Sequence, residues 1–200
     1  VNGALYFRPV LQGPLAPAAD ETEAPATTEA PTTTEAPEGS TTTTTTAPGS
    51  DLPTTSPDQD QPDGTSVLQQ LNVDGEVIDR WQVGPEEVDA TAVAEANQTT
   101  YQSSEAVQVV MKEGSPGIDQ FNSLAEACFD KAANCPVGAY SVVFDSVVVT
   151  VSTVRPDDST FKPFSTTGVI IWSPDWTADQ AKVTTAIIKA GEMPVGLTVA

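Results

Sequence analysis

The side chains that most often do chemistry in proteins are sparse in this sequence. Histidine is absent, which removes the commonest general base and the usual partner of a serine or cysteine nucleophile. Ser115 lies in a Gly-Ser-Pro-Gly stretch, but the spacing is not the Gly-x-Ser-x-Gly of a nucleophile elbow. Ser115 followed by Pro116 is more typical of a helix start, so we predict no catalytic residue and a non-enzymatic protein.

Two groups of carboxylates have spacings that could serve metal binding or acid–base work. Asp58, Asp60 and Asp63 loosely follow a calcium loop. Gln69, however, stands where such a loop requires a bidentate Glu, and solvated linker charge is the preferred interpretation. The pair at 157–158 follows a proline and is more typical of a turn. No glycine-rich phosphate loop or nucleotide fingerprint is present, and we predict neither a metal nor a cofactor.

Two further pairs of residues are candidates for a structural or binding role. Cys128 and Cys135 predict a disulfide, and two buried free thiols are the alternative. Trp172 and Trp176 flank a predicted strand-to-helix turn, where one of them could offer an aromatic surface to an extended peptide. The alternative is that both rings pack on the core.

The charged residues are distributed unevenly along the chain. The formal net charge is −20, and residues 12–66 contain no Lys or Arg, few large apolar side chains and a repeated Thr, Pro, Ala and Glu theme. Such a segment cannot bury enough apolar surface to offset its ordering entropy, and we predict a disordered linker over 12–66. The acidic surface argues against binding nucleic acid or an anionic membrane.

The remaining segments predict an α+β fold. Strands are expected at 4–11, at 67–73 and 76–83 around Asp74-Gly75, at 106–112, at 139–144 and 147–154 around Asp145-Ser146, at 168–172 and at 193–199. Helices are expected at 91–96, after Ser115-Pro116, and from a Thr177/Gln180 capping box to Gly191. No apolar run approaches the roughly 20 residues that span a bilayer.

Several segments, read in order, resemble SecD, a membrane subunit of the protein-export machinery. Ala4-Leu5-Tyr6-Phe7-Arg8-Pro9-Val10 resembles the family's L-x-F-R-P-V strand, and Val-Gly-Pro-Glu-Glu-Val at 83–88 resembles its L-G-P-A-E-V segment. Residues 112–122 and the positions of both cysteines resemble actinobacterial-type members. Residues 139–154 resemble the family hairpin, with Ser146 in place of its turn glycine, and 189–195 resemble L-K-A-G-A-L-P-V.

The resemblance implies a fragment of the first large extracytoplasmic domain of a cell-membrane protein. It implies a partial ferredoxin-like base from residues 1–11 and 175–200, with an inserted mixed sheet and helix head at 67–174. The implied partners are an unfolded preprotein, a SecF-like subunit and the Sec channel, with export driven by proton flow, and no nucleic acid. The alternative function is a non-catalytic cell-surface or secreted structural or binding module on a mucin-like stalk.

Overall fold

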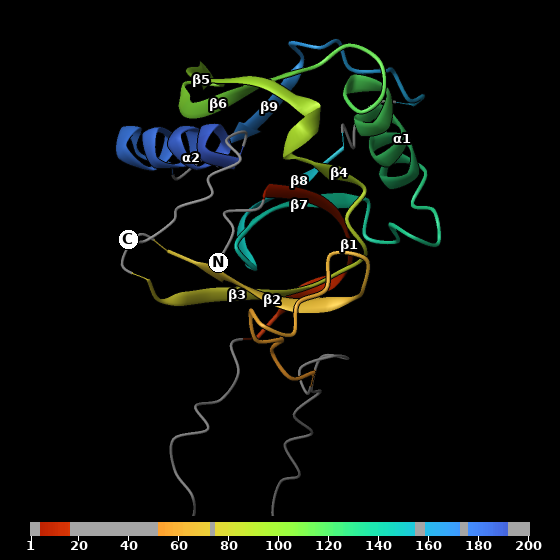
Figure 1. Cartoon of the computed structure of the whole chain (residues 1–200), viewed down its shortest axis with the longest axis vertical. Helices are drawn as coiled ribbons and strands as arrows, with labels where there is room; N and C mark the ends of the chain where they lie inside the picture. Colours follow the sequence, from red (N-terminus) through yellow and green to blue (C-terminus); the bar gives the residue numbers. More distant parts are fainter. Residues whose placement is uncertain (1–4, 17–51, 73–74, 155–158, 173–175, 192–200) are drawn as a thin grey trace, which may run out of the picture.

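The computed structural model describes residues 5–16, 52–72, 75–154, 159–172 and 176–191. It is an α+β protein made mostly of strands, with two helices (Figure 1). The strands are β1 (Leu5–Leu15), β2 (Ser66–Leu71), β3 (Val77–Val83), β4 (Val88–Asp89), β5 (Val93–Tyr101), β6 (Ser104–Met111), β7 (Ala139–Phe144), β8 (Val147–Thr153) and β9 (Val169–Trp172). The helices are α1 (Ile118–Phe129) and α2 (Ala178–Gly191), and a 3₁₀ turn covers Ala90–Ala92.

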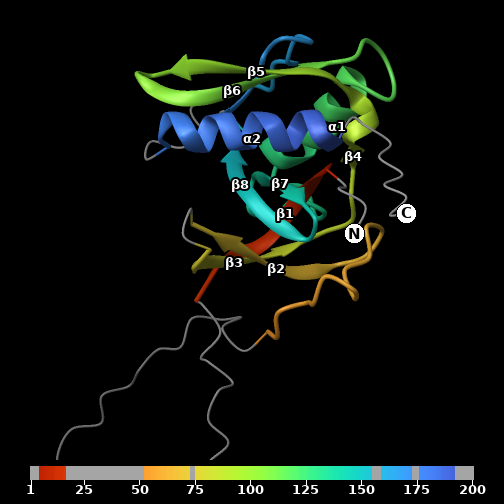
Figure 2. The same ribbon diagram turned by 60° about the vertical axis from the view of Figure 1, so that its left-hand side comes forward.

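The strands form two sheets. One has the order β3-β2-β8-β7-β1-β4, and an additional β1–β3 pairing makes β1, β3, β2, β8 and β7 a ring, which we call the closed sheet (Figure 1). The other, the open sheet, has the order β5-β6-β9. Figure 2 shows α2 between the open sheet and the closed sheet.

Strand β1 runs four residues further than the sequence indicated. Its first half pairs with β7, and its second half pairs with β3 through Leu15 opposite Arg80. Gly13 permits this continuation, because its φ is +143° and a Cβ there would lie 2.5 Å from the Trp81 ring. The prediction that the linker begins at residue 12 is therefore wrong, because the cross-strand partner of Gly13 lies far away in the sequence.

The far end of the predicted linker is also part of the fold. Thr55 donates its N–H to the Val67 carbonyl at 2.8 Å, and the Val67 N–H donates to the Thr55 hydroxyl at 2.9 Å. The side chain of Asp60 is 5% exposed and pairs with Arg8 at 2.8 Å. Residues 52–66 are thus not a disordered linker, and Asp60 is not a solvated linker charge. Composition alone does not reveal that this segment is ordered, because Arg8, which binds Asp60, lies 52 residues away in the sequence.

The main core lies between the two sheets and around both helices. Phe121 of α1 contacts three rings edge-on or nearly so, with centroid distances of 5.7 Å to Phe7, 5.4 Å to Tyr140 and 5.4 Å to Phe164. A smaller cluster of Leu68, Val83, Val143 and Val148 fills the closed sheet. Such aromatic contacts fix the position of α1 against β1 and β7.

Helix α1 was predicted at the right place but with the wrong cap. The N-cap is Gly117, which makes no side-chain cap hydrogen bond, so Ser115 is not the capping residue. The first N–H groups are satisfied by backbone instead: Ile118 donates to the Lys112 carbonyl and Asp119 to that of Gly114. The backbone carbonyls of this tight loop therefore replace a side-chain cap. At the other end of α1 the predicted Cys128–Cys135 disulfide is confirmed.

The segment 91–96, predicted as a helix, is a 3₁₀ turn followed by the start of β5. Its alanines favour a helix locally, but β5 pairs with β6 from Val93 to Tyr101, and tertiary pairing overrides the propensity. The hairpins β2–β3 and β7–β8, the strands β6 and β9, and the capping box of α2 are confirmed.

The turn between β7 and β8 holds both Asp145 (φ 48°) and Ser146 (φ 64°) in the left-handed region. A two-residue hairpin turn of this kind requires positive φ at both central residues, which explains why a glycine would suit position 146. Ser146 lies close enough to Asp60 to contribute to the lowered pKa of that carboxyl, after Ser66 and Arg8, so the turn lies beside the Arg8–Asp60 pair.

The predicted boundary between base and head does not coincide with a break in the sheet. β1 pairs with β3, β4 and β7, all from the segment assigned to the head. The ferredoxin-like base stays a prediction, because the strand expected at 193–199, including Leu197, lies outside the described residues. Within the described part of the chain, no helix combines the length and apolar character needed to cross a bilayer.

Replacing both cysteines, Cys128→Ala with Cys135→Ala, should lower the free energy of unfolding by about 2.5 kcal/mol, as expected for a disulfide that closes so short a loop. Urea unfolding measures the change. A reductant should shift the wild-type midpoint similarly and leave the double variant unaffected. A midpoint insensitive to both changes would contradict the prediction.

Stability should fall at alkaline pH because of Tyr140. Burial raises the pKa of Tyr140 to about 12, although a hydrogen bond with Ser152 opposes this. A tyrosine in the unfolded chain ionises near pH 10, so this stability is complete below about pH 10 and is lost as pH rises towards 12. The loss is roughly 2–3 kcal/mol, from the pKa difference.

Tyr140→Phe keeps the ring and should remove that alkaline component, as measured by urea unfolding between pH 9 and 12. Tyr101→Phe, at a tyrosine 39% exposed, is the matched control and should retain it. Equal alkaline slopes in wild type and Tyr140→Phe would count against the assignment.

Candidate functional site

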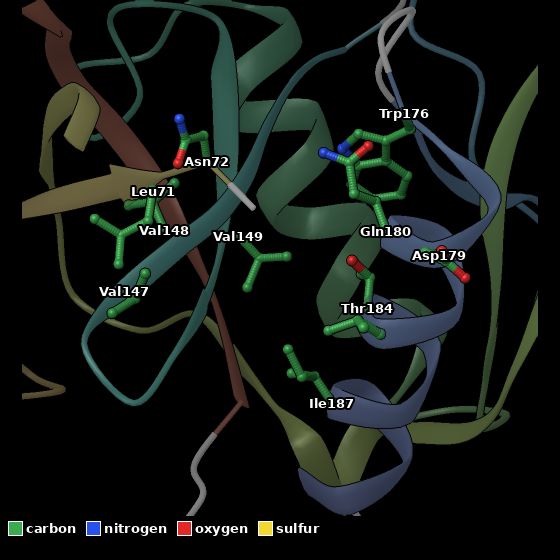
Figure 3. A pocket seen from close by; sticks show the side chains of 11 residues that line it. Leu71, Asn72, Val147, Val148, Val149, Trp176, Asp179, Gln180, Thr184 and Ile187 are labelled. Atoms are coloured by element: carbon green, nitrogen blue, oxygen red, sulfur yellow. The ribbon is translucent and has the colours of Figure 1, made fainter. Parts of the chain in front are cut away.

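A pocket lies in a groove between α2 and the closed sheet, which we call the α2 groove. Its volume is about 420 Å³, within the range of about 300–1,000 Å³ usual for ligand sites. Figure 3 shows side chains from β8 and the end of β2 on one side and from α2 on the other. The lining residues are Leu71, Asn72, Val147, Val148, Val149, Trp176, Asp179, Gln180, Val183, Thr184 and Ile187.

The helical side of the groove follows from the start of α2. The Thr177 N–H donates to the Gln180 side-chain oxygen at 2.6 Å, and the Gln180 N–H donates to the Thr177 hydroxyl at 3.3 Å. This capping box fixes the first turn. The face carrying Ala181 and Ile188 is buried in the main core. The adjacent stripe, at steps of three and four residues, lines the groove.

Val183 is the most exposed apolar side chain of the groove. It is 57% exposed, whereas Trp176 packs partly against the main core. A valine so exposed beside the other apolar lining residues makes this a surface suited to an apolar partner.

The sheet side of the groove includes a strand edge. Val147 and Val148 of β8 pair in parallel with Gln69 and Gln70 of β2. Beyond them, from Val149 onwards, β8 pairs with β7 along one edge only, as far as the described strands extend. An edge with unpaired peptide groups can accept an additional strand.

The chemistry of the groove suits binding rather than reaction. Asp179 is the one charged residue among its lining side chains, and the rest are apolar or neutral polar groups. Within the described residues, no three His, Cys, Asp or Glu side chains gather to hold a metal. The groove thus offers apolar surface, an aromatic ring and backbone hydrogen bonding.

A second polar centre surrounds Arg8, which is fully buried. Arg8 donates to the Gly84 carbonyl at 2.6 Å, to Asp60 at 2.8 Å and to the Gly64 carbonyl at 2.7 Å. Burial alone would raise the pKa of Asp60, but hydrogen bonds from Ser66 and Arg8 outweigh it and hold the pKa below its usual value. This centre joins β1 to the loop before β2 and to the end of β3.

Glu86 lies near the same centre, and its pKa is shifted in the opposite direction from that of Asp60. Burial, followed by the charge of Asp89, raises the pKa of Glu86. Its Oε2 atom is buried without a hydrogen-bond partner in the described structure. Carboxylates crowded in this way make the region acidic but do not form a ligand cage.

The structure separates the two tryptophans that the sequence singled out. Trp176 lines the α2 groove, whereas Trp172 lies in the open sheet with its ring 5.3 Å from that of Tyr101 and does not line the groove. Sequence reasoning missed Val149 and Val183. The helical spacing of 176, 180, 183 and 187 was available as a signal, but it could not show that β8 lies opposite.

The described residues form an α+β module of two sheets with a largely apolar groove between α2 and the closed sheet. No protein-family model matches the chain, and no curated protein matches it. Among solved structures, the chain is similar to SecDF in a super-membrane-facing form, with a TM-score of 0.48 and 12% identity over 96% of this chain and 19% of that one.

It is also similar to a structure described as a membrane component, SecDF, that enhances protein export, with a TM-score of 0.47 and 14% identity. That overlap covers 97% of this chain and 65% of the other. The chain thus spans about a fifth of one similar protein and about two thirds of the other. With identities and TM-scores this low, the two likenesses carry no functional argument.

Proposed function

We propose that this chain is a non-catalytic, extracytoplasmic, SecD-like module that engages a translocating preprotein during Sec-dependent export. The observation that carries the proposal is the α2 groove, which combines apolar side chains with the open edge of β8. The ordered set of SecD-like motifs supports the family, including the L-x-F-R-P-V strand that forms the first part of β1.

The occupant of the groove is an extended, apolar segment of unfolded polypeptide. The helical residues that line the groove, Asp179 to Ile187, span about 12 Å along α2, from the rise of about 1.5 Å per residue. An extended peptide covers this distance with about four residues. Its backbone would pair with β8, and alternate side chains would contact Val149 and Val183, a mode in which pairing is independent of the peptide's sequence. That suits a partner that differs from one exported protein to the next.

The wider assignment follows from the same proposal. The module belongs to a cell-membrane protein, acts beside a SecF-like subunit and the Sec channel, and contributes to export driven by the proton motive force. It binds neither nucleic acid nor a cofactor. The acidic surface supports the first exclusion, since phosphate binding requires Lys and Arg that this chain has in small number.

A photo-crosslinking residue at position 183 tests the proposal in cells during preprotein export. We expect adducts with the exported chain at position 183. Position 78 is the matched control, because Ile78 is also an exposed apolar residue (45%) but lies on β3 outside the groove. Equal labelling at both positions, or none at 183, would contradict a preprotein site here.

Val183→Asp should weaken binding of an unfolded apolar peptide at least about tenfold, because a carboxylate would be desolvated in the occupied groove. Ile78→Asp should leave the affinity unchanged. Fluorescence of Trp176, on the groove wall, can report the binding. If both variants bind like wild type, the groove is not the binding site.

A further inference from the structure

We propose that Arg80 holds Ala16 and Leu52 close together, and that the two sheets fold without the intervening residues 17–51, which we call the appendage. The sequence alone predicted a disordered linker over residues 12–66 and did not indicate which residue holds its two ends. The inference concerns the organisation of the chain and does not depend on the proposed function.

Arg80 contacts both points at which the described chain stops and resumes. Its Nε donates to the Ala16 carbonyl at 2.6 Å, and its Nη1 donates to the Leu52 carbonyl at 2.6 Å. A longer contact of 3.4 Å reaches the Thr54 hydroxyl. Because the two donors belong to one planar guanidinium, the two carbonyl oxygens lie within about 8 Å of each other.

The position of Arg80 explains why the contact is firm. The residue is 1% exposed and sits in β3 directly opposite Leu15, the last residue of β1. A buried cation is costly unless its N–H groups are used, so both carbonyls are needed where they are. Lysine could not reproduce this, since its single ammonium lacks the fixed fork that reaches two separate acceptors.

Further anchors follow directly on the returning side. Thr55 exchanges two hydrogen bonds with Val67 of β2, and Asp60 and Gly64 accept from Arg8. The returning chain is therefore bound to the closed sheet from Leu52 to the start of β2. The described part of the chain extends to Ala16 and resumes at Leu52, with 35 residues of sequence between them.

The composition of residues 17–51 agrees with an appendage. The segment has seven carboxylates (Asp20, Glu21, Glu23, Glu29, Glu35, Glu38 and Asp51) and no Lys or Arg. It has little apolar surface with which to stabilise the two sheets. Both views show the end of β1 and the start of the returning segment on the side of the closed sheet away from α2 (Figures 1 and 2).

The first test replaces residues 17–51 by Gly-Ser-Gly-Ser in the otherwise complete chain. The variant should unfold in one cooperative transition, with an unfolding equilibrium constant roughly 25-fold lower than that of wild type, because the closure entropy of a loop scales with the 3/2 power of its length. A higher constant, or loss of the cooperative transition, would overturn the proposal.

The second test asks whether Arg80 holds the two ends together. In the complete chain, Arg80→Met should speed hydrogen exchange of the Thr55 amide at least about tenfold, because charge-assisted hydrogen bonds at both ends are lost. Arg80→Lys should also accelerate exchange, since it cannot bridge the two carbonyls.

In the shortened chain, where four residues join the two ends covalently, Arg80→Met should accelerate exchange several-fold less. The same acceleration in both chains would show that Arg80 only fills space, and unchanged exchange would show that it holds nothing. Either result overturns its assigned role. The amide of Phe121, in the middle of the molecule, serves as the internal reference for global opening.

Discussion

The structure depends on β1 being paired along both of its edges. One edge of its first half pairs with β7, the other contacts β4, and its second half crosses to β3. Because side chains alternate between the two faces of a strand, Phe7 packs in the main core against Phe121, whereas the neighbouring Arg8 contacts the loop before β2. A single strand thus closes one sheet, positions α1 through its aromatic ring and orders the chain that returns from the acidic segment.

Among the basic residues that the structure describes, Arg8 and Arg80 are buried, which is unusual in a chain with so large an excess of carboxylates. Each of the two donates to at least two backbone carbonyls. Carbonyls are fixed by the course of the chain, so each guanidinium specifies where a segment passes. The buried cations therefore act as geometric constraints on the loops, whereas the exposed acidic residues contribute solubility and repulsion.

Local signals predicted local structure well. The apolar spacing of α1, the capping box of α2 and the β-branched runs of the hairpins each depend on residues close in sequence, and all were found. Apart from the cap of α1, which a local loop replaces, the failures involve distant partners: Gly13 continues a strand because of Trp81, residues 93–96 are a strand because of β6, and Asp60 is buried because of Arg8. The same limit applies to the groove. Trp176 could be chosen from the sequence around it, whereas choosing Val149 required knowing that β8 faces α2.

The groove and the ends of the appendage occupy different parts of the closed sheet, and different interactions maintain them. The groove requires α2 to lie against the open sheet, where the Gln98 side chain donates to the Ala178 carbonyl at 2.9 Å and Ala181 and Ile188 are buried. The ends of the appendage require Arg80 and the β1–β3 pairing. Arg80, which holds the ends of the appendage, does not line the groove. The length and composition of the acidic segment can therefore change without altering the apolar surface that α2 and β8 present.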